Sequence, residues 1–256
     1  MGAGTVTVVV IPARAGSTRF PGKATAPLRG RPVVQWTHQA ATQARRVTRV
    51  VVATDCDGIA EVCQGFGAEV MVSRELLATG TDRTAAVAAH LDAECAVNLQ
   101  ADEPFISPDV IDRVIEAVEA GHPVATAAGP LDEACGTDPH QVTVLTDQAD
   151  RALYFSRAAV PHPWSGGHFD ELRGSGRAAK HLGIYGFTRE ALARIAAAPP
   201  GVLERVEGLE QLRFLELGLP VTVVPSPQAP ISINVPSDLA AAEAAAEALA
   251  RERGAP

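Results

Sequence analysis

The chain has 256 residues, of which 46% are hydrophobic and 20% charged, and its formal net charge is −8. This composition argues against a disordered chain, and the acidic balance argues against a general basic surface that binds nucleic acid. The first apolar run, Val6–Ile11, is far shorter than the roughly 20 residues that a membrane-spanning helix needs. We therefore expect a cytoplasmic globular protein with neither a nucleic-acid nor a membrane partner.

Short apolar runs alternate with helical patterns over the first half of the chain. The expected strands are Val6–Ile11, Val47–Thr54, Ala68–Ser73, Ala96–Gln100 and Pro123–Ala127. The expected helices are Pro32–Ala44, Gly58–Phe66, Asp82–Asp92 and Pro108–Ala120. Strands that are apolar throughout are typical of a sheet covered on both faces, and their alternation with helices requires right-handed crossovers. The pattern predicts an α/β fold with a mostly parallel, doubly wound, Rossmann-like sheet.

The pattern changes in the second half. Gln141–Leu145 and Arg151–Phe155 are expected to form an antiparallel hairpin, and Ser165–Gly176, rich in Gly and Ser, a mobile loop. The remaining expected elements are a strand at His181–Phe187, helices at Arg189–Ala197 and Leu203–Leu217, a strand at Val221–Val224 and an Ala-rich helix at Ser237–Arg253. Because no linker separates these pieces, we predict one domain over residues 1–256, with 138–187 as a β-hairpin-rich insertion.

A cationic segment that contains glycines follows the first expected strand. Arg14, Arg19 and Lys23 fall within ten residues, beside Gly16 and Gly22. Ligands of open parallel sheets bind beyond the carboxyl ends of the strands, glycine lets the backbone approach a phosphate, and the cations neutralise its oxygens. The segment matches neither GxGxxG nor GxxxxGK[ST], which disfavours a dinucleotide fold and a P-loop. The residues predict a phosphate site of another kind; a solvated loop with scattered cations is the alternative.

Several further motifs follow this segment in order. They are Ala53-Thr54-Asp55, Thr79-Gly80-Thr81-Asp82-Arg83, Asn98-Leu99-Gln100-Ala101-Asp102-Glu103-Pro104, Tyr154-Phe155-Ser156-Arg157, His181-Leu182-Gly183-Ile184-Tyr185-Gly186 and Leu209-Glu210-Gln211-Leu212-Arg213. Together with Val9–Arg14, Ser17-Thr18-Arg19 and Pro21-Gly22-Lys23, this series spans nearly the whole chain and resembles the 3-deoxy-manno-octulosonate cytidylyltransferase (CMP-Kdo synthetase) family.

The resemblance implies a Mg²⁺-dependent transfer of CMP from CTP to a 3-deoxy-2-ulosonic acid, with release of pyrophosphate, by a homodimer. It assigns the nucleotide to Arg14, Ser17, Arg19, Lys23, Thr79, Arg83 and Gln100. It assigns the acidic sugar to Gln100, Arg157, His181, Tyr185, Glu210 and Gln211. It assigns Mg²⁺ to Asp102 and Asn234, and catalysis to Lys23, Asp102 and Arg19. It also implies that the 138–187 insertion binds the sugar or the partner subunit.

Several of these side chains have a structural explanation as well. Asp102 can be a helix-entry aspartate, and Arg157 a partner in a salt bridge instead of a bidentate ligand of a carboxylate, the role that Arg83 could also take. His181 can be a hydrogen-bonded structural histidine, and Glu210 with Gln211 can line a solvated helix face.

Asn234 departs from the family, which usually has an aspartate at this position, and residues 161–177 match the family poorly. The amide oxygen can still bind Mg²⁺ but carries no charge, so the affinity for the metal should be lower. These departures leave open a cytidylyltransferase for another acidic acceptor, such as a nonulosonic acid, an amino-substituted Kdo or a phosphonate. They also leave open a catalytically weak nucleotide-binding module, and a purine nucleotidyltransferase for sugar 1-phosphates shares the expected fold.

Overall fold

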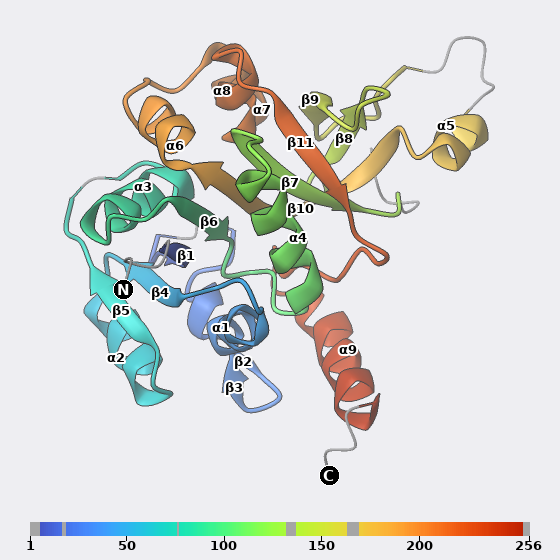
Figure 1. Cartoon of the computed structure of the whole chain (residues 1–256). Coiled ribbons are helices and arrows are strands. Elements are labelled where there is room, and N and C mark those ends of the chain that lie inside the picture. Colours follow the sequence, from blue (N-terminus) through green and yellow to red (C-terminus); the bar gives the residue numbers. More distant parts are fainter. Residues whose placement is uncertain (1–5, 17–18, 76, 132–136, 163–168, 253–256) are drawn as a thin grey trace. The chain divides into compact units, whose positions relative to one another are not determined.

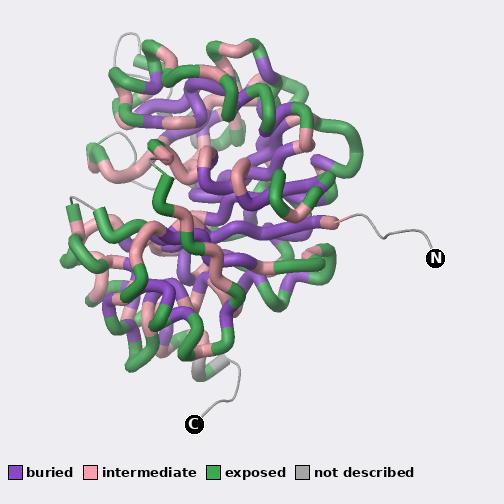
Figure 2. Tube along the Cα trace, turned by 90° about the vertical axis from the view of Figure 1, so that its left-hand side faces the viewer, coloured by how far each residue is buried: buried purple, intermediate pink, exposed green. Residues whose placement is uncertain are grey.

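A computed structural model describes residues 6–16, 19–75, 77–131, 137–162 and 169–252 (Figure 1). The chain gathers into two compact units: unit 1 comprises Met1–Asp112 and Pro230–Pro256, and unit 2 comprises Arg113–Ala229. Figure 2 shows several long, continuously buried stretches of the chain. The assignment of one domain with an insertion at 138–187 stays a prediction.

Unit 1 contains a parallel sheet with the strand order β6, β1, β4, β5. The strands are β1 (Thr7–Ala13), β4 (Arg49–Thr54), β5 (Glu69–Val72) and β6 (Cys95–Leu99). Four consecutive residues of β1, Val8 to Ile11, are fully buried, as expected for a strand covered on both faces. The predicted mostly parallel sheet is confirmed here.

The helices of unit 1 wind in two directions around this sheet. Helices α1 (Val33–Gln43) and α2 (Asp57–Gly65) lie on one face, and α3 (Gly80–His90) lies on the other (Figure 1). The chain adds β4 and β5 on one side of β1 and then returns to place β6 on the other side. Such a reversal is a topological switch point, where the loops after the two central strands diverge and leave room for a ligand.

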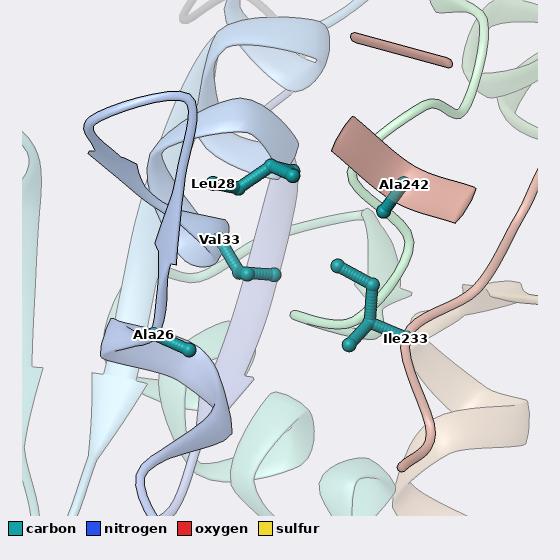
Figure 3. Close-up of a cluster of buried hydrophobic side chains, with 5 residues drawn as sticks. All are labelled: Ala26, Leu28, Val33, Ile233 and Ala242. Carbon is teal, nitrogen blue, oxygen red and sulfur yellow. The ribbon is translucent and has the colours of Figure 1, made fainter. Parts of the chain in front are cut away.

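The C-terminal segment returns to unit 1 and closes it. Helix α9 (Asp238–Glu252) packs on the short strand β2 (Pro27–Leu28), which pairs with β3 (Arg31–Pro32). In Figure 3 the side chains of Leu28 and Val33 point toward Ile233 and Ala242, and all four are buried. This packing holds residues 230–238 within unit 1.

Unit 2 contains a mostly antiparallel sheet with the strand order β11, β7, β10, β8, β9. The strands are β7 (Val124–Gly129), β8 (Thr143–Thr146), β9 (Ala152–Ser156), β10 (Ala178–Thr188) and β11 (Val221–Pro225). Among these five strands, only β11 and β7 pair in parallel. The predicted hairpin is confirmed as β8 and β9, paired through Val144 and Phe155.

Two expected elements of unit 2 are wrong. The predicted helix over Leu203–Leu217 is two helices, α7 (Val202–Glu207) and α8 (Gln211–Glu216), because Gly208 adopts a left-handed conformation with φ 63° and ends α7. The second error concerns the loop expected at Ser165–Gly176. Residues 163–168 lie outside the described part of the chain, but Phe169–Ser175 form helix α5.

The other helices match their expected positions closely. They are α4 (Pro108–Glu119) and α6 (Arg189–Ala196), with a short 3₁₀ helix η1 (Lys23–Thr25) that the sequence did not predict. Helix α3 begins two residues earlier than expected because Thr79 and Asp82 form a capping box. No helix in the described ranges combines the length and apolar character needed to cross a bilayer.

Strand β10 packs closely on α4 at Gly186. A Cβ atom built at Gly186 would lie 2.7 Å from Val114 Cγ1 and 2.9 Å from Val118 Cγ2. We expect Gly186→Ala to lower the free energy of unfolding by about 1–3 kcal/mol, since the two valines must shift. Guanidinium denaturation measures this change.

Gly65→Ala is the matched control, because nothing lies within 4 Å of a Cβ atom at that helical position. Its free energy of unfolding should stay unchanged or rise by up to about 1 kcal/mol. Equal destabilisation by both substitutions would contradict the packing argument.

Candidate functional site

The loops that follow β1 and β6 meet at the switch point of unit 1. Lys23 lies in η1 after β1, and Asp102 lies in the turn after β6. Lys23 Nζ forms an ion pair with Asp102 Oδ2, and the two side chains are only 15% and 14% exposed. The structure thus brings together the lysine and the carboxylate to which the resemblance assigns the nucleotide and the metal.

Main-chain contacts hold the Asp102 turn in place. Glu103 N donates to Gln100 O at 3.1 Å, which closes the turn. Thr37 Oγ1, on α1, donates to Ala101 O at 2.9 Å, and Ile233 N donates to Asp102 O at 3.0 Å. Because α1 and the C-terminal segment both anchor this turn, the Asp102 carboxylate is presented on a rigid backbone.

Asn234 is placed beside the Asp102 turn by the same hydrogen bond from Ile233. Asn234 N and Val235 N both donate to Asp238 Oδ2, at 2.7 and 3.0 Å, so the loop before α9 is fixed as well. Among the described residues, no group of three His, Cys, Asp or Glu side chains could hold a metal ion. Oxygen atoms from Asp102 and Asn234 suit a Mg²⁺ ion that takes its other ligands from substrate phosphates and water.

Arg83 is a buried cation with unused donors. Its side chain is 4% exposed, and Nη2 donates to Asp55 Oδ2 at 2.7 Å. Within the described part of the chain, the buried Nε and Nη1 have no hydrogen-bond partner. A buried guanidinium with unpaired N–H groups is costly unless a further acceptor arrives, which suits an oxygen-rich ligand.

Asp55 is a residue whose contribution sequence reasoning missed. It follows β4 at the carboxyl edge of the sheet, pairs with Arg83, and accepts a hydrogen bond from Ala15 N at 3.4 Å. Its position directly after an apolar strand was the available signal. Arg14, from the same loop as Ala15, donates through Nη1 to Ala78 O at 2.8 Å.

The other predicted nucleotide residues are less engaged with this cluster. Thr79 is the N-cap of α3: its Oγ1 accepts from Asp82 N at 3.1 Å, and its N donates to Asp82 Oδ2 at 2.9 Å. Arg19 is exposed and Gln100 half-buried. Ser17 lies outside the described residues. Nucleotide contacts from these four residues stay predictions.

His181 is the centre of a polar and aromatic cluster in unit 2. Its Nε2 lies 2.9 Å from Thr126 Oγ1, and its ring contacts those of Phe155 and Tyr185 with centroid distances of 5.2 Å each. Burial of the imidazole lowers the pKa of His181 to about 3. The side chain is therefore neutral at physiological pH.

The hydrogen bonds assign the tautomer of this neutral ring. Thr126 Oγ1 donates its single proton to Ile184 O at 2.6 Å, and a carbonyl can only accept. The hydroxyl must therefore accept from His181, so Nε2 carries the ring proton. Nδ1 is left as a hydrogen-bond acceptor, which suits a ligand hydroxyl as donor.

The remaining predicted sugar residues of unit 2 are buried, half-buried or hydrogen-bonded to its main chain. Tyr185 and Gln211 are 1% and 2% exposed, and Glu210 is half-buried. Arg157 donates to the main-chain carbonyls of Glu207, Pro139 and Gly208, at 3.0, 2.6 and 3.3 Å. Contact of these four residues with a sugar stays a prediction.

Known proteins resemble this chain over nearly its whole length. Residues 8–221 match a protein family described as cytidylyltransferase. The 3-deoxy-manno-octulosonate cytidylyltransferase of Anaeromyxobacter dehalogenans is 44% identical over 238 residues, which cover 92% of this chain and 96% of that protein. The enzyme of the same name from Synechococcus elongatus is 39% identical over 241 residues, which cover 93% and 96%.

A solved structure gives the same result in three dimensions. CMP:2-keto-3-deoxy-manno-octonic acid synthetase in complex with CTP is 31% identical, with a TM-score of 0.85, covering 95% of this chain and 99% of that one. The resemblance inferred from the ordered motifs and the predicted fold class are both confirmed.

The low pKa of His181 predicts how stability depends on pH. Between the usual pKa of about 6.5 and about 3, the unfolded chain binds one more proton at this residue than the folded chain. Its contribution to the free energy of unfolding therefore falls as the pH drops below about 6.5, with a slope that approaches about 1.4 kcal/mol per pH unit once the unfolded imidazole is fully protonated. In His181→Gln, stability should fall less steeply between pH 6.5 and 5, as measured by denaturation at several pH values.

The exposed His90→Gln substitution is the matched control and should keep the wild-type slope. The same slope in His181→Gln as in the wild type would contradict a neutral His181.

Proposed function

Because this chain belongs to the cytidylyltransferase family, we propose that it transfers CMP from CTP to a 3-deoxy-2-ulosonic acid, Kdo or a close relative, and releases pyrophosphate. The observation that carries this proposal is the ion pair of Lys23 with Asp102 at the switch point of unit 1. The pair places an ammonium group that can bind phosphate beside a carboxylate that can bind a metal ion, at the edge where open parallel sheets bind their ligands.

In the proposed reaction, the anomeric hydroxyl of the acceptor attacks the α-phosphorus of CTP and pyrophosphate leaves. Positioning and charge neutralisation account for most of the catalysis in such transfers. Lys23 and Arg19 would neutralise the transferred and leaving phosphates, with Arg14 on the nucleotide. The unpaired Nε and Nη1 of Arg83 would donate to oxygen atoms of the nucleotide.

We further propose that Asp102 and Asn234 hold a Mg²⁺ ion. When bound, the ion offsets the negative charge of the triphosphate and orients it. Lys23 contacts Oδ2 of Asp102, so the other carboxylate oxygen, Oδ1, would serve as the ligand of the metal. The rigid Asp102 turn and the Asp238-capped Asn234 loop support this assignment, since both ligands start from a fixed backbone.

Unit 2 would supply the residues that select the acceptor. His181 Nδ1 is available in the neutral ring as an acceptor for a sugar hydroxyl, and Glu210 and Gln211 would contribute further polar contacts. A homodimer and a cytoplasmic location stay predictions, as does a contact of Tyr185 with the sugar.

A second candidate is the same transfer to another acidic acceptor, favoured by Asn234 and by the divergent segment 161–177. A panel of Kdo, amino-substituted Kdo, nonulosonic acids and phosphonates, assayed for pyrophosphate release with CTP, separates the two. Exclusive turnover of Kdo would eliminate the second candidate. Replacement of CTP by GTP or ATP in the same assay tests the purine nucleotidyltransferase alternative.

Lys23→Met is expected to lower kcat/KM for CTP by roughly 10²- to 10³-fold, as does the loss of one donor to a developing oxyanion in other enzymes. Arg31→Met, which removes an exposed cation on β3, is the matched control and should retain activity. Pyrophosphate release with CTP, Mg²⁺ and Kdo measures both. Near-wild-type turnover by Lys23→Met would refute the assigned role of the ion pair.

Asn234→Asp is expected to strengthen Mg²⁺ binding by about tenfold or more, since a charge pair at 4 Å contributes roughly 4 kcal/mol at an effective dielectric constant near 20, before desolvation. Titration calorimetry with Mg²⁺ and CTP measures this affinity, and Asn234→Ala should weaken it. Equal affinities in all three proteins would remove residue 234 from the metal site. Turnover that appears only in Asn234→Asp would identify the natural chain as a weak nucleotide-binding module.

A further inference from the structure

The end of β9 is tied to the end of α7 in unit 2. Ser156 Oγ donates to Glu207 Oε1 at 2.8 Å, and Arg157 N donates to Glu207 Oε2 at 3.2 Å. One carboxylate thus receives two hydrogen bonds from the last residues of the hairpin. This contact fixes the position at which α7 ends.

The guanidinium of Arg157 holds the same helix end from its main-chain side. Nε donates to Glu207 O at 3.0 Å and Nη2 to Gly208 O at 3.3 Å, while Nη1 donates to Pro139 O at 2.6 Å. The last carbonyls of a helix have no partner within the helix, so an arginine that bonds to them satisfies groups that would otherwise be unpaired.

The turn that follows leads directly to Glu210 and Gln211. Gly208 takes a left-handed conformation with φ 63°, and Leu209 N donates to Glu204 O at 3.2 Å. The far side of the turn is held by Arg213, whose Nε and Nη2 bond to the Glu204 carboxylate at 2.8 and 2.6 Å in a buried pair. The segment 208–211 is therefore clamped at both ends.

We propose that Arg157 is a positioning residue that sets the 208–211 turn, and through it Glu210 and Gln211, instead of gripping the carboxylate of the acceptor. The Nε–Nη2 edge of its guanidinium, which would receive a carboxylate bidentately, is occupied by the carbonyls of Glu207 and Gly208. Release of Arg157 toward a substrate would leave those carbonyls unpaired. The role assigned to Glu210 and Gln211 rests on the proposed function.

Hydrogen exchange tests the positioning without any turnover. In Arg157→Gln, the amides of Leu209, Leu212 and Arg213 should exchange at least about tenfold faster, since hydrogen bonds to a charged group are lost. Arg205→Gln, which changes an exposed arginine on α7, is the matched control and should leave those rates unchanged. Unchanged exchange in Arg157→Gln would overturn the proposal.

Kinetics with an altered acceptor separate positioning from direct contact. In Arg157→Gln, KM for the acidic acceptor should rise about tenfold or more, while KM for CTP changes less than about twofold. The preference for the acceptor over its carboxamide analogue should persist in this variant. Loss of that preference would identify Arg157 as the ligand of the carboxylate and overturn the proposal.

Glu207→Ala is a second variant in which KM for the acceptor should rise while KM for CTP stays nearly unchanged. An anionic side chain cannot attract an acidic acceptor, so a rise in acceptor KM there reports a structural change where β9 meets α7 and not the loss of a contact with the acceptor. Normal acceptor KM in Glu207→Ala would count against the clamp. Absence of turnover in the wild-type protein would refute the proposed function, whereas the exchange rates would still report on the positioning role.

Discussion

The ion pair between Lys23 and Asp102 is the interaction on which the proposed nucleotide site of unit 1 depends. Both side chains are about 85% buried, where a single unpaired charge would be strongly destabilising. Each charge therefore stabilises the other until a ligand supplies new partners. The pair can exist only because β1 and β6 are neighbours, so that two loops far apart in sequence leave the sheet at one edge. The order of the strands, more than the local loop sequences, makes the site.

Main-chain hydrogen bonds around Asp102 and Asn234 explain how the proposed metal site can keep its geometry when the charge of residue 234 changes. The Asp102 turn is anchored by Thr37 and by Ile233, and Asp238 fixes the loop that carries Asn234. None of these contacts uses the side chain of Asn234. An asparagine in place of the family's usual aspartate at this position therefore changes the charge next to the proposed metal but removes none of these contacts.

Unit 2 uses polar side chains mainly to satisfy one another and the backbone. Short helices leave a large share of their carbonyls without partners, and the sheet of unit 2 carries a register shift between His181 and Tyr185. Arg157 bonds to the end of α7, Glu204 is buried with Arg213, and His181 shares a hydroxyl with the backbone at Ile184. Arg157 and His181, to which the resemblance assigns the acceptor, thus also take part in contacts that support the backbone of unit 2. We propose that selectivity for the acceptor comes from the few atoms left over, such as His181 Nδ1.

The sequence by itself determined the parallel strands, their crossover helices, the hairpin and the two loops that carry Lys23 and Asp102. These features depend on local patterns: apolar runs, turn residues, and charges placed directly after strands. It did not reveal that Gly208 divides the segment 203–217, that residues 169–175 are helical, or that Asp55 neutralises a buried Arg83. The first two are local features that the periodic pattern did not show, although a glycine is a common end of a helix. The ion pair was decided by the tertiary structure, because pairing between distant residues depends on which strands become neighbours, and hydrophobic periodicity carries no information about that choice.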